Sequence, residues 1–163
     1  MILFRIKKWD IYFENNRTRE LKKLDWIPVP NKHDGDGYTE LISRENGVEL
    51  YGAWNLILQV ASKCNPRGVL VRESPDDEES RTLLREGAVI SSLGIKAHDS
   101  ESISRISRGN AGIIEEALIV CVEIGWIERI VLSGNTLHNP APACDNPAPA
   151  CDNPAPACAK VPK

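Results

Sequence analysis

The sequence lacks the signatures of several common functional classes. It has no glycine-rich phosphate loop, no HExxH and no GxSxG, so the usual motifs of nucleotide hydrolases, zinc peptidases and α/β-hydrolases are missing. Five cysteines occur without a CxxC pair, which argues against a zinc site. No apolar run approaches the roughly 18 residues of a membrane span. We therefore expect a cytoplasmic, non-enzymatic protein with no metal, no cofactor and no membrane partner.

An overall excess of positive charge is also missing, although the charge is unevenly distributed. The 163 residues hold 20 Lys and Arg against 23 Asp and Glu, a net charge of −3. Residues 1–32 hold 8 basic against 4 acidic residues, whereas residues 33–96 hold 7 against 11 and residues 97–132 hold 3 against 6. A basic arm of this kind can bind a polyanion, or it can be an ordinary solvated surface.

The most informative segment is residues 97–132, which predicts a helix, a tight turn and a longer helix. Asp99 or Ser100 can cap the first helix, and Asn110 can cap the second, because short polar side chains accept the free backbone N–H groups there. Ile103 and Ile106 are predicted to share a face of the first helix. The apolar stripe of the second helix is formed by Ile114, Ala117, Leu118, Cys121 and Val122.

A strand is predicted directly after this second helix. Gly125 can adopt the left-handed conformation that ends a helix, and the following residues, WIERIVL, have strand-like composition. Two helices joined by a short turn are typical of a helix-turn-helix, and the strand after them favours a winged helix. The alternative is a helical hairpin that only builds core.

The N-terminal region, residues 1–45, is interpreted as a basic arm and extended segment packed on the core. Residues 2–13 predict an edge strand or an extended arm, and Thr18 can cap a short helix within 15–23. Phosphates could be contacted there by Arg17, Arg19, Lys22 and Lys23, although an exposed basic helix without a partner is an equal alternative. Pro28 and Pro30 make residues 24–30 extended.

Two Asp-Gly pairs mark residues 31–38 as a loop. They predict tight turns with positive φ, followed by a short helix over residues 38–43. His33, Asp34 and Asp36 could hold a metal, but the further acidic ligands of a calcium loop are absent at the required spacing. A structural turn is therefore preferred.

Residues 46–132 are interpreted as one winged-helix domain. A helix is predicted from Asn46 or Gly47 to Lys63, with Leu50, Trp54, Ile57, Leu58 and Ala61 buried. Cys64 and Cys121 lie in helical stripes, where a free cysteine behaves as a small buried hydrophobe. Residues 69–71 predict a short strand that could pair with residues 126–132. Residues 74–96 form an insertion of undecided structure, in which Gly87 weakens a helix.

Residues 133–163 predict a disordered linker built on a heptapeptide repeat. Residues 139–159 read NPAPACD, NPAPACD, NPAPACA. Proline at every second or third position blocks helices and favours an extended, polyproline-like chain. The cysteines of the repeat, Cys144, Cys151 and Cys158, do not match the spacing of short zinc motifs.

Several segments together resemble the N-terminal winged-helix domain of phage and prophage-type replication initiation proteins, which are replisome organiser-like. They are Trp9 with ENNRTREL (14–21), WIPVPNKHDGDGY (26–38), GAWNLILQVASKC (52–64) with PRG (66–68), SISRISR (102–108) and EEALIVCVEIGWIE (115–128). The resemblance spans about residues 5–130 and contains no catalytic signature. It implies a winged helix with a role in replication, joined by a linker to a further C-terminal domain.

The expected fold is therefore α+β, mainly α: a winged helix-turn-helix with a small β-hairpin, an N-terminal arm and a C-terminal tail. The expected function is DNA binding in phage-type replication initiation or as a primosome accessory, with double-stranded DNA and replication proteins as partners. The predicted contacts are Arg105, Ser107, Arg108, Asn110, Arg129, Arg17, Arg19, Lys22 and Lys23.

The second helix itself is a weak candidate for reading DNA. It carries Glu115, Glu116 and Glu123 and no Lys or Arg, and carboxylates repel phosphates. The alternative is a protein-docking module without DNA binding, with Ile113 and Ile119 as exposed apolar contacts. His98, just before the helix cap, is expected to be a surface residue.

Overall fold

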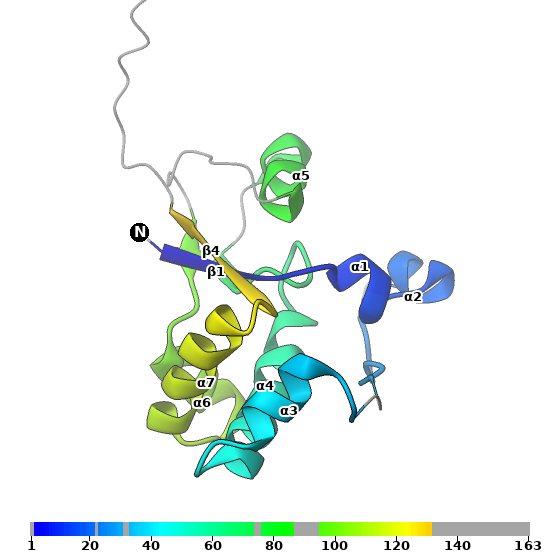
Figure 1. The fold of residues 1–163 in the computed structure, drawn as a ribbon. Coiled ribbons are helices and arrows are strands. Elements are labelled where there is room, and N and C mark those ends of the chain that lie inside the picture. Colours follow the sequence, from blue (N-terminus) through cyan, green and yellow to red (C-terminus); the bar gives the residue numbers. More distant parts are fainter. Residues whose placement is uncertain (1, 22, 31–32, 74–75, 87–94, 132–163) are drawn as a thin grey trace, which may run out of the picture.

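A computed structural model describes residues 2–21, 23–30, 33–73, 76–86 and 95–131. Within these residues the chain forms seven helices and four short strands (Figure 1). The expected α+β class, mainly helical, is confirmed. The elements are β1 (Ile2–Ile6), α1 (Trp9–Tyr12), α2 (Asn16–Glu20), α3 (Asp36–Ile42), α4 (Gly47–Ala61), β2 (Val71–Glu73), α5 (Glu78–Glu86), β3 (Lys96–Ala97), α6 (Ser100–Ser107), α7 (Ala111–Glu123) and β4 (Ile127–Val131).

The first strand is hydrogen-bonded on both sides, although the sequence predicted an edge strand or an extended arm. β1 pairs antiparallel with β4 along its whole length, from Ile2 opposite Val131 to Ile6 opposite Ile127. On the other side of β1, the N–H of Leu70 donates to the carbonyl oxygen of Phe4 at 2.9 Å. The N-terminal segment therefore lies between β4 and the chain at residues 68–70, and Leu3 and Ile6 are buried below it.

The position of β1 between these two segments rules out one predicted strand pair. Residues 69–71 do not pair with residues 126–132, because β1 occupies the position between them. Instead β2 pairs with β3, and β4 pairs with β1. Among the described residues β4 has β1 as its partner and forms no hairpin with a following strand, so the sheet differs from the predicted wing.

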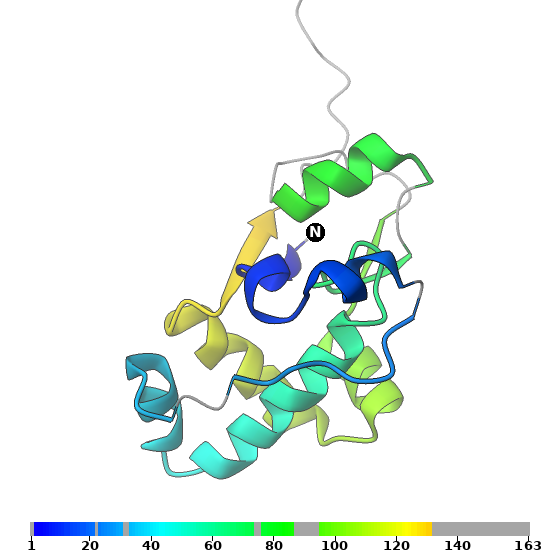
Figure 2. The same ribbon diagram turned by 90° about the vertical axis from the view of Figure 1, so that its right-hand side faces the viewer.

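Three helices enclose the core beneath the paired strands. α4 packs on both α6 and α7, and α6 packs on α7. Figures 1 and 2 show β1 and β4 between this three-helix group and α5. The predicted stripe of α4 is confirmed, since each of its five members is buried. In α7 the predicted stripe is buried except for Val122, which is half-buried.

Ile103 and Ile106 lie about 60° apart around α6, on one face as predicted. Ile103 is fully buried, whereas Ile106, in the last turn, is 50% exposed. The prediction that His98 is a surface residue is wrong. His98 is 6% exposed, because its backbone N–H donates to Leu70 O and its ring lies against the start of α6. The burial predicted for Cys64 and Cys121 is confirmed.

The N-terminal helices begin differently from what the sequence indicated. Asn15 caps α2, and Thr18 completes the capping box from the third helical position. The Asp-Gly pairs do not form turns of positive φ: Gly35 has φ of −77° at the cap of α3, and Gly37 lies inside α3. The short helix predicted there is confirmed, with an earlier start.

Part of the ambiguous insertion is helical. α5 covers Glu78–Glu86 and buries Leu84 completely. The guanidinium group of Arg5 donates to the carbonyl oxygen of Arg85, which joins α5 to β1. Residues 87–94, including Gly87, and the predicted linker at 133–163 lie outside the described residues.

Candidate nucleic-acid interface

The predicted helix-turn-helix segment forms two helices joined by a tight turn. Asp99 accepts the N–H of Ser102 at 2.7 Å and so begins α6 with a capping box. α6 ends at Arg108, whose φ of 58° turns the chain. Asn110 then caps α7, and Gly125, with φ of 80°, follows its C-terminus as predicted. The local sequence signals in this segment are therefore confirmed.

Two of the residues predicted to contact DNA, Ser107 and Asn110, also form hydrogen bonds within the turn. The Oγ of Ser107 donates to the carbonyl oxygen of Ile103 at 2.8 Å. The Oδ1 of Asn110 accepts the N–H groups of Gly112 at 2.9 Å and Ile113 at 3.2 Å. These bonds occupy the side-chain carbonyl oxygen of Asn110 and the Ser107 hydroxyl proton, and they leave the side-chain amide N–H groups of Asn110 free to donate. Arg105 and Arg108 are exposed.

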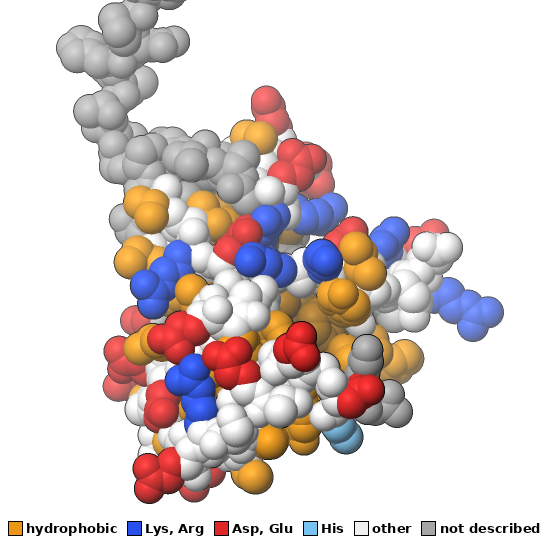
Figure 3. Space-filling model, viewed as in Figure 1, with side chains coloured by type: hydrophobic (Ala, Val, Ile, Leu, Met, Phe, Trp, Pro, Cys, Tyr) orange, Lys and Arg blue, Asp and Glu red, His pale blue; other side chains and the backbone are white. Residues whose placement is uncertain are grey.

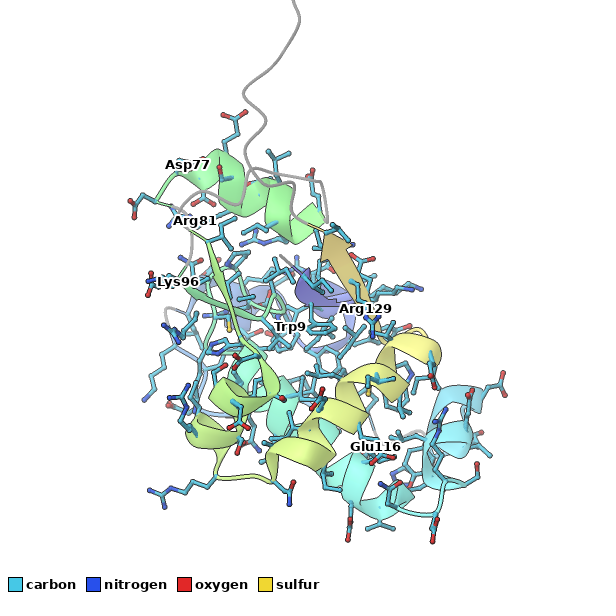
Figure 4. The ribbon with its side chains drawn as sticks, turned by 90° about the vertical axis from the view of Figure 1, so that its left-hand side faces the viewer. Trp9, Asp77, Arg81, Lys96, Glu116 and Arg129 are labelled. Carbon is cyan, nitrogen blue, oxygen red and sulfur yellow. The ribbon has the colours of Figure 1, made fainter. Side chains whose placement is uncertain are left out.

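The outward face of α7 is acidic. Glu115, Glu116 and Glu123 are exposed on it. Glu123 accepts from Arg44 at 2.9 Å and Glu116 accepts from Asn46 at 2.8 Å, so both contact the corner between α3 and α4. In Figure 4, Glu116 lies beside that corner. A helix with this face cannot neutralise phosphates, which is the main source of non-specific affinity for DNA.

The other residues that the sequence predicted to contact DNA do not form one continuous surface with the α6–α7 turn. Arg129 is exposed on β4, opposite Phe4. Arg17 and Arg19 lie on α2, and Figure 1 shows α2 on the opposite side of the molecule from the α6–α7 turn. Lys23 is exposed beyond α2, and Lys22 lies outside the described residues.

A different surface gathers positive charge. A groove of about 1200 Å³ is bounded by α1 and α2, the end of β1, the loop after α4, and α5. We call it the basic groove. Its basic residues outnumber its carboxylates eight to four; they are Arg5, Lys7, Lys8, Arg19, Lys23, Lys63, Arg67 and Arg85, against Asp10, Glu14, Glu86 and Glu128. Figure 3 shows Lys and Arg side chains gathered between α5 and α1.

Two of these arginines hold the groove together. Arg5 forms an ion pair with Glu128 across the β1–β4 pair. Arg67 binds Glu14 at 3.0 Å and the carbonyl oxygen of Thr18 at 2.9 Å, and it also donates to the carbonyl of Leu21. The Arg67 and Glu14 side chains are only 15% and 12% exposed. Arg67 therefore ties α2 to the loop after α4.

The other cations of the groove remain at its surface. Lys7, Lys8, Arg19, Lys23, Lys63 and Arg85 are exposed, against the two exposed carboxylates Asp10 and Glu86. Lys23 contacts Asp25 at 3.5 Å, but both side chains are largely exposed. Exposed ion pairs of this kind contribute little to stability. Taken as formal charges, six cations and two carboxylates give the groove a surface charge of +4 in a chain whose total is −3.

A buried indole also lines the basic groove. Trp9 is 6% exposed, and its ring packs on Phe13 at 5.0 Å. A Cβ at Gly68, where φ is 81°, would lie 2.5 Å from Trp9, so only glycine allows this approach. The Nε1 donor of Trp9 has no hydrogen-bond partner among the described residues. A buried donor without a partner is unusual in native proteins.

Sequence reasoning found only two residues of the groove, Arg19 and Lys23. It missed Lys7 and Lys8 after β1, Lys63 after α4 and Arg85 in α5, which come from three separate parts of the chain. The adjacent lysines at the end of the first apolar segment were a usable signal. Nothing local indicated that Lys63 and Arg85 would lie near them.

The titratable groups of the core do not form a reactive site. Burial raises the pKa of Cys64 to about 11 and that of Cys121 to about 12, so both are protonated thiols at neutral pH. Burial lowers the pKa of His98, and its Nδ1 lies 3.0 Å from the Oγ of Ser102. His33 stacks on Tyr38. Within the ranges that the structure describes, no group of three or more His, Cys, Asp or Glu side chains could hold a metal ion.

Comparisons with family models, with curated proteins and with solved structures found no match. Among the described residues no helix is both long and apolar enough to cross a membrane.

Proposed function

We propose that this protein binds nucleic acid through the basic groove. The observation that carries the proposal is the set of six exposed cations against two exposed carboxylates in one concave surface. Phosphate neutralisation by Lys and Arg supplies most non-specific affinity for nucleic acid. The acidic face of α7 makes the usual recognition helix a poor alternative.

DNA is the nucleic acid favoured by the sequence. The segments that resemble phage-type replication initiation proteins include most of α4, α6 and α7, and the two helices α6 and α7, joined by a tight turn, are compatible with that resemblance. Under this proposal Arg105 and Arg108 provide at most a second phosphate contact. Replication initiation, or a primosome accessory role, is the setting that the resemblance implies.

Salt-dependent binding of the full chain, kept reduced, tests the proposal. Labelled duplex and single-stranded DNA are titrated at several salt concentrations. If about four phosphates are neutralised, affinity falls roughly a hundredfold between 50 and 200 mM salt. Absence of binding even at 20 mM salt would overturn the proposal.

Charge reversal locates the site. The variant Lys7→Glu with Lys63→Glu changes two exposed groove residues. Its matched control, Arg105→Glu with Arg108→Glu, makes the same charge change at the α6–α7 turn. We expect the groove variant to lose at least about tenfold in affinity with a flatter salt slope, while the control changes by less than about threefold. The reverse order of effects would return the site to the helix-turn-helix.

The alternative function is protein docking without DNA binding. Ile119 is exposed on α7 between acidic residues, and Ile106 is exposed at the end of α6. Ile113, the other apolar contact that the sequence predicted, is half-buried and packs against the core. Docking becomes the better hypothesis if neither duplex nor single-stranded DNA binds at low salt.

A further inference from the structure

A second hollow adjoins the basic groove. We call it the aromatic pocket. Its volume is about 560 Å³, within the range of roughly 300–1,000 Å³ typical of small-molecule sites. Aromatic side chains dominate its wall: Tyr12, Phe13, Tyr38, Tyr51, Trp54 and Trp126. Figure 3 shows a hydrophobic hollow directly beside the gathered Lys and Arg side chains.

The two hollows share one wall. Ile6, Lys7 and Lys8 line both the basic groove and the aromatic pocket. Lys7 donates its backbone N–H to Trp126 O at 2.9 Å, and Lys8 O accepts the N–H of Tyr12 at 3.1 Å. These bonds fix the shared wall to two of the pocket's aromatic residues. The backbone of Lys8 has φ of 54°, a left-handed conformation that is energetically unfavourable for a residue with a side chain.

The aromatic rings already support one another. Trp126 lies 5.2 Å from Trp54, and Trp54 lies 6.3 Å from Phe13, measured between ring centroids. Phe13 in turn packs on Trp9, which lines the basic groove. Tyr12 is 52% exposed, so a ring face remains available at the mouth of the pocket. The pocket is therefore held in shape without a ligand.

The aromatic rings and the two lysines of the pocket favour a planar ligand that has a negatively charged group close to its ring. Aromatic faces stack on planar ligands, and the two lysines favour an anion. Among the described residues no Asp or Glu lines the pocket, so no carboxylate there could form an ion pair with a cationic ligand. A nucleobase with its phosphate satisfies both conditions.

We propose that the aromatic pocket takes an unstacked base of a single-stranded nucleic acid, whose backbone continues across Lys7 and Lys8 into the basic groove. This inference rests on the proposed function, because the basic groove holds the backbone. In a duplex the bases are paired and stacked, so their faces are not available to an aromatic wall. Proteins that bind single strands combine a positively charged groove with such stacking surfaces.

An abasic strand distinguishes phosphate binding in the basic groove from base binding in the aromatic pocket. The full chain, kept reduced, is titrated with a labelled single-stranded oligonucleotide, with an abasic strand of equal length and with the matching duplex. The abasic strand keeps the phosphates and lacks the bases. We expect the normal strand to bind at least about fivefold more tightly than the abasic strand, the lower end of what stacking one base contributes. The intrinsic tryptophan fluorescence should change only with the normal strand.

Substitutions then assign the effect to the pocket. Tyr12→Ala with Tyr38→Ala should lower single-strand affinity by at least about fivefold, with the salt slope and the affinity for the abasic strand unchanged. Tyr12→Phe keeps the ring and should bind normally. Trp26→Ala removes an exposed aromatic ring that does not line the pocket, and it should have no effect. Circular dichroism and thermal unfolding confirm that each variant is folded.

The possible negative results distinguish an error in the proposed function from an error in the pocket inference. If no nucleic acid binds at low salt, the proposed function itself is wrong. If normal and abasic strands bind equally, with a steep salt dependence, the groove proposal stands and the pocket inference is overturned. A synthetic peptide of the NPAPACD repeat that binds in the pocket, together with equal binding of the two strands, would make the pocket a proline-rich docking site and would also overturn the inference.

Discussion

Leu70 donates its backbone N–H to the carbonyl oxygen of Phe4 at 2.9 Å, while the other side of β1 pairs with β4. Residues separated by more than sixty positions therefore meet at the first strand. Leu3 and Ile6, three residues apart in β1, are both buried by this arrangement. The N-terminal segment is thus an integral part of the core.

Truncation of Leu3 should therefore destabilise the whole protein. Leu3 is 0% exposed, and removal of a buried leucine side chain costs roughly 2–5 kcal/mol. We expect Leu3→Ala to lower the free energy of unfolding by this amount in urea titrations. Its neighbour Ile2 is 52% exposed, so Ile2→Ala should change stability by less than about 0.5 kcal/mol. Equal effects would contradict the observed register of β1.

His98 should make stability depend on pH in mildly acidic solution. Burial is the main cause of its lowered pKa, with Arg72 nearby as a second cause. The unfolded chain therefore binds a proton more readily than the folded one, and the free energy of unfolding should fall as the pH drops below about 6.5. In His98→Gln this part of the pH dependence should disappear. Titrations of both proteins in urea between pH 5 and 8 check the prediction.

The carboxylate of Asp99 should stabilise the start of α6. Its hydrogen bonds from the backbone and side chain of Ser102 lower its pKa. Asp99→Ala should cost about 1 kcal/mol at neutral pH. A lowered pKa means that the charged cap stabilises the fold above the ordinary value of 3.8 and that this advantage is lost as the pH falls through the folded value. Asp99→Asn can still cap the helix, so it should retain most of the stability both at neutral pH and at a pH below the folded pKa of Asp99.

The pair formed by Arg67 and Glu14 should be strongly coupled. Both side chains are largely buried, and their atoms lie 3.0 Å apart. Removal of one partner of a buried ion pair costs about 3–5 kcal/mol, because the other charge remains buried without a partner. We expect Arg67→Met to be destabilising and Arg67→Met with Glu14→Gln to recover part of the loss. Additive effects in this double-mutant cycle would contradict the contact.

The two core cysteines should be unreactive in the folded protein. Their pKa values, raised by burial to about 11 at Cys64 and about 12 at Cys121, leave little thiolate at pH 8. Iodoacetamide at that pH should modify them only after denaturant is added, as peptide mass spectrometry would show. Modification of either residue in the native protein, at a rate similar to a free thiol, would contradict its placement.

Local signals predicted α4, α6, α7 and their caps because each depends on residues within a few positions of one another. Asn110 and Gly125 are examples in which a single side chain, or its absence, defines a helix end. The apolar stripe of α4 predicted its buried face for the same reason. These features follow from helix periodicity and capping chemistry.

The strand order and the basic groove could not be predicted in this way. The pairing of Ile2 with Val131 joins the two ends of the described chain, and nothing in either strand specifies the other as its partner. The groove brings Lys7, Lys63 and Arg85 together from three elements. His98 was misplaced because its burial depends on Leu70, a contact far away in the sequence.

The central position of β1 has a consequence for synthesis of the chain. The ribosome makes β1 first, but its partners at residues 68–70 and 127–131 follow much later. The edge of β1 that pairs with β4 must stay unpaired until β4 has left the exit tunnel, even after residues 68–70 have been made. During that time its apolar residues are open to wrong partners, a known hazard of long-range strand pairing.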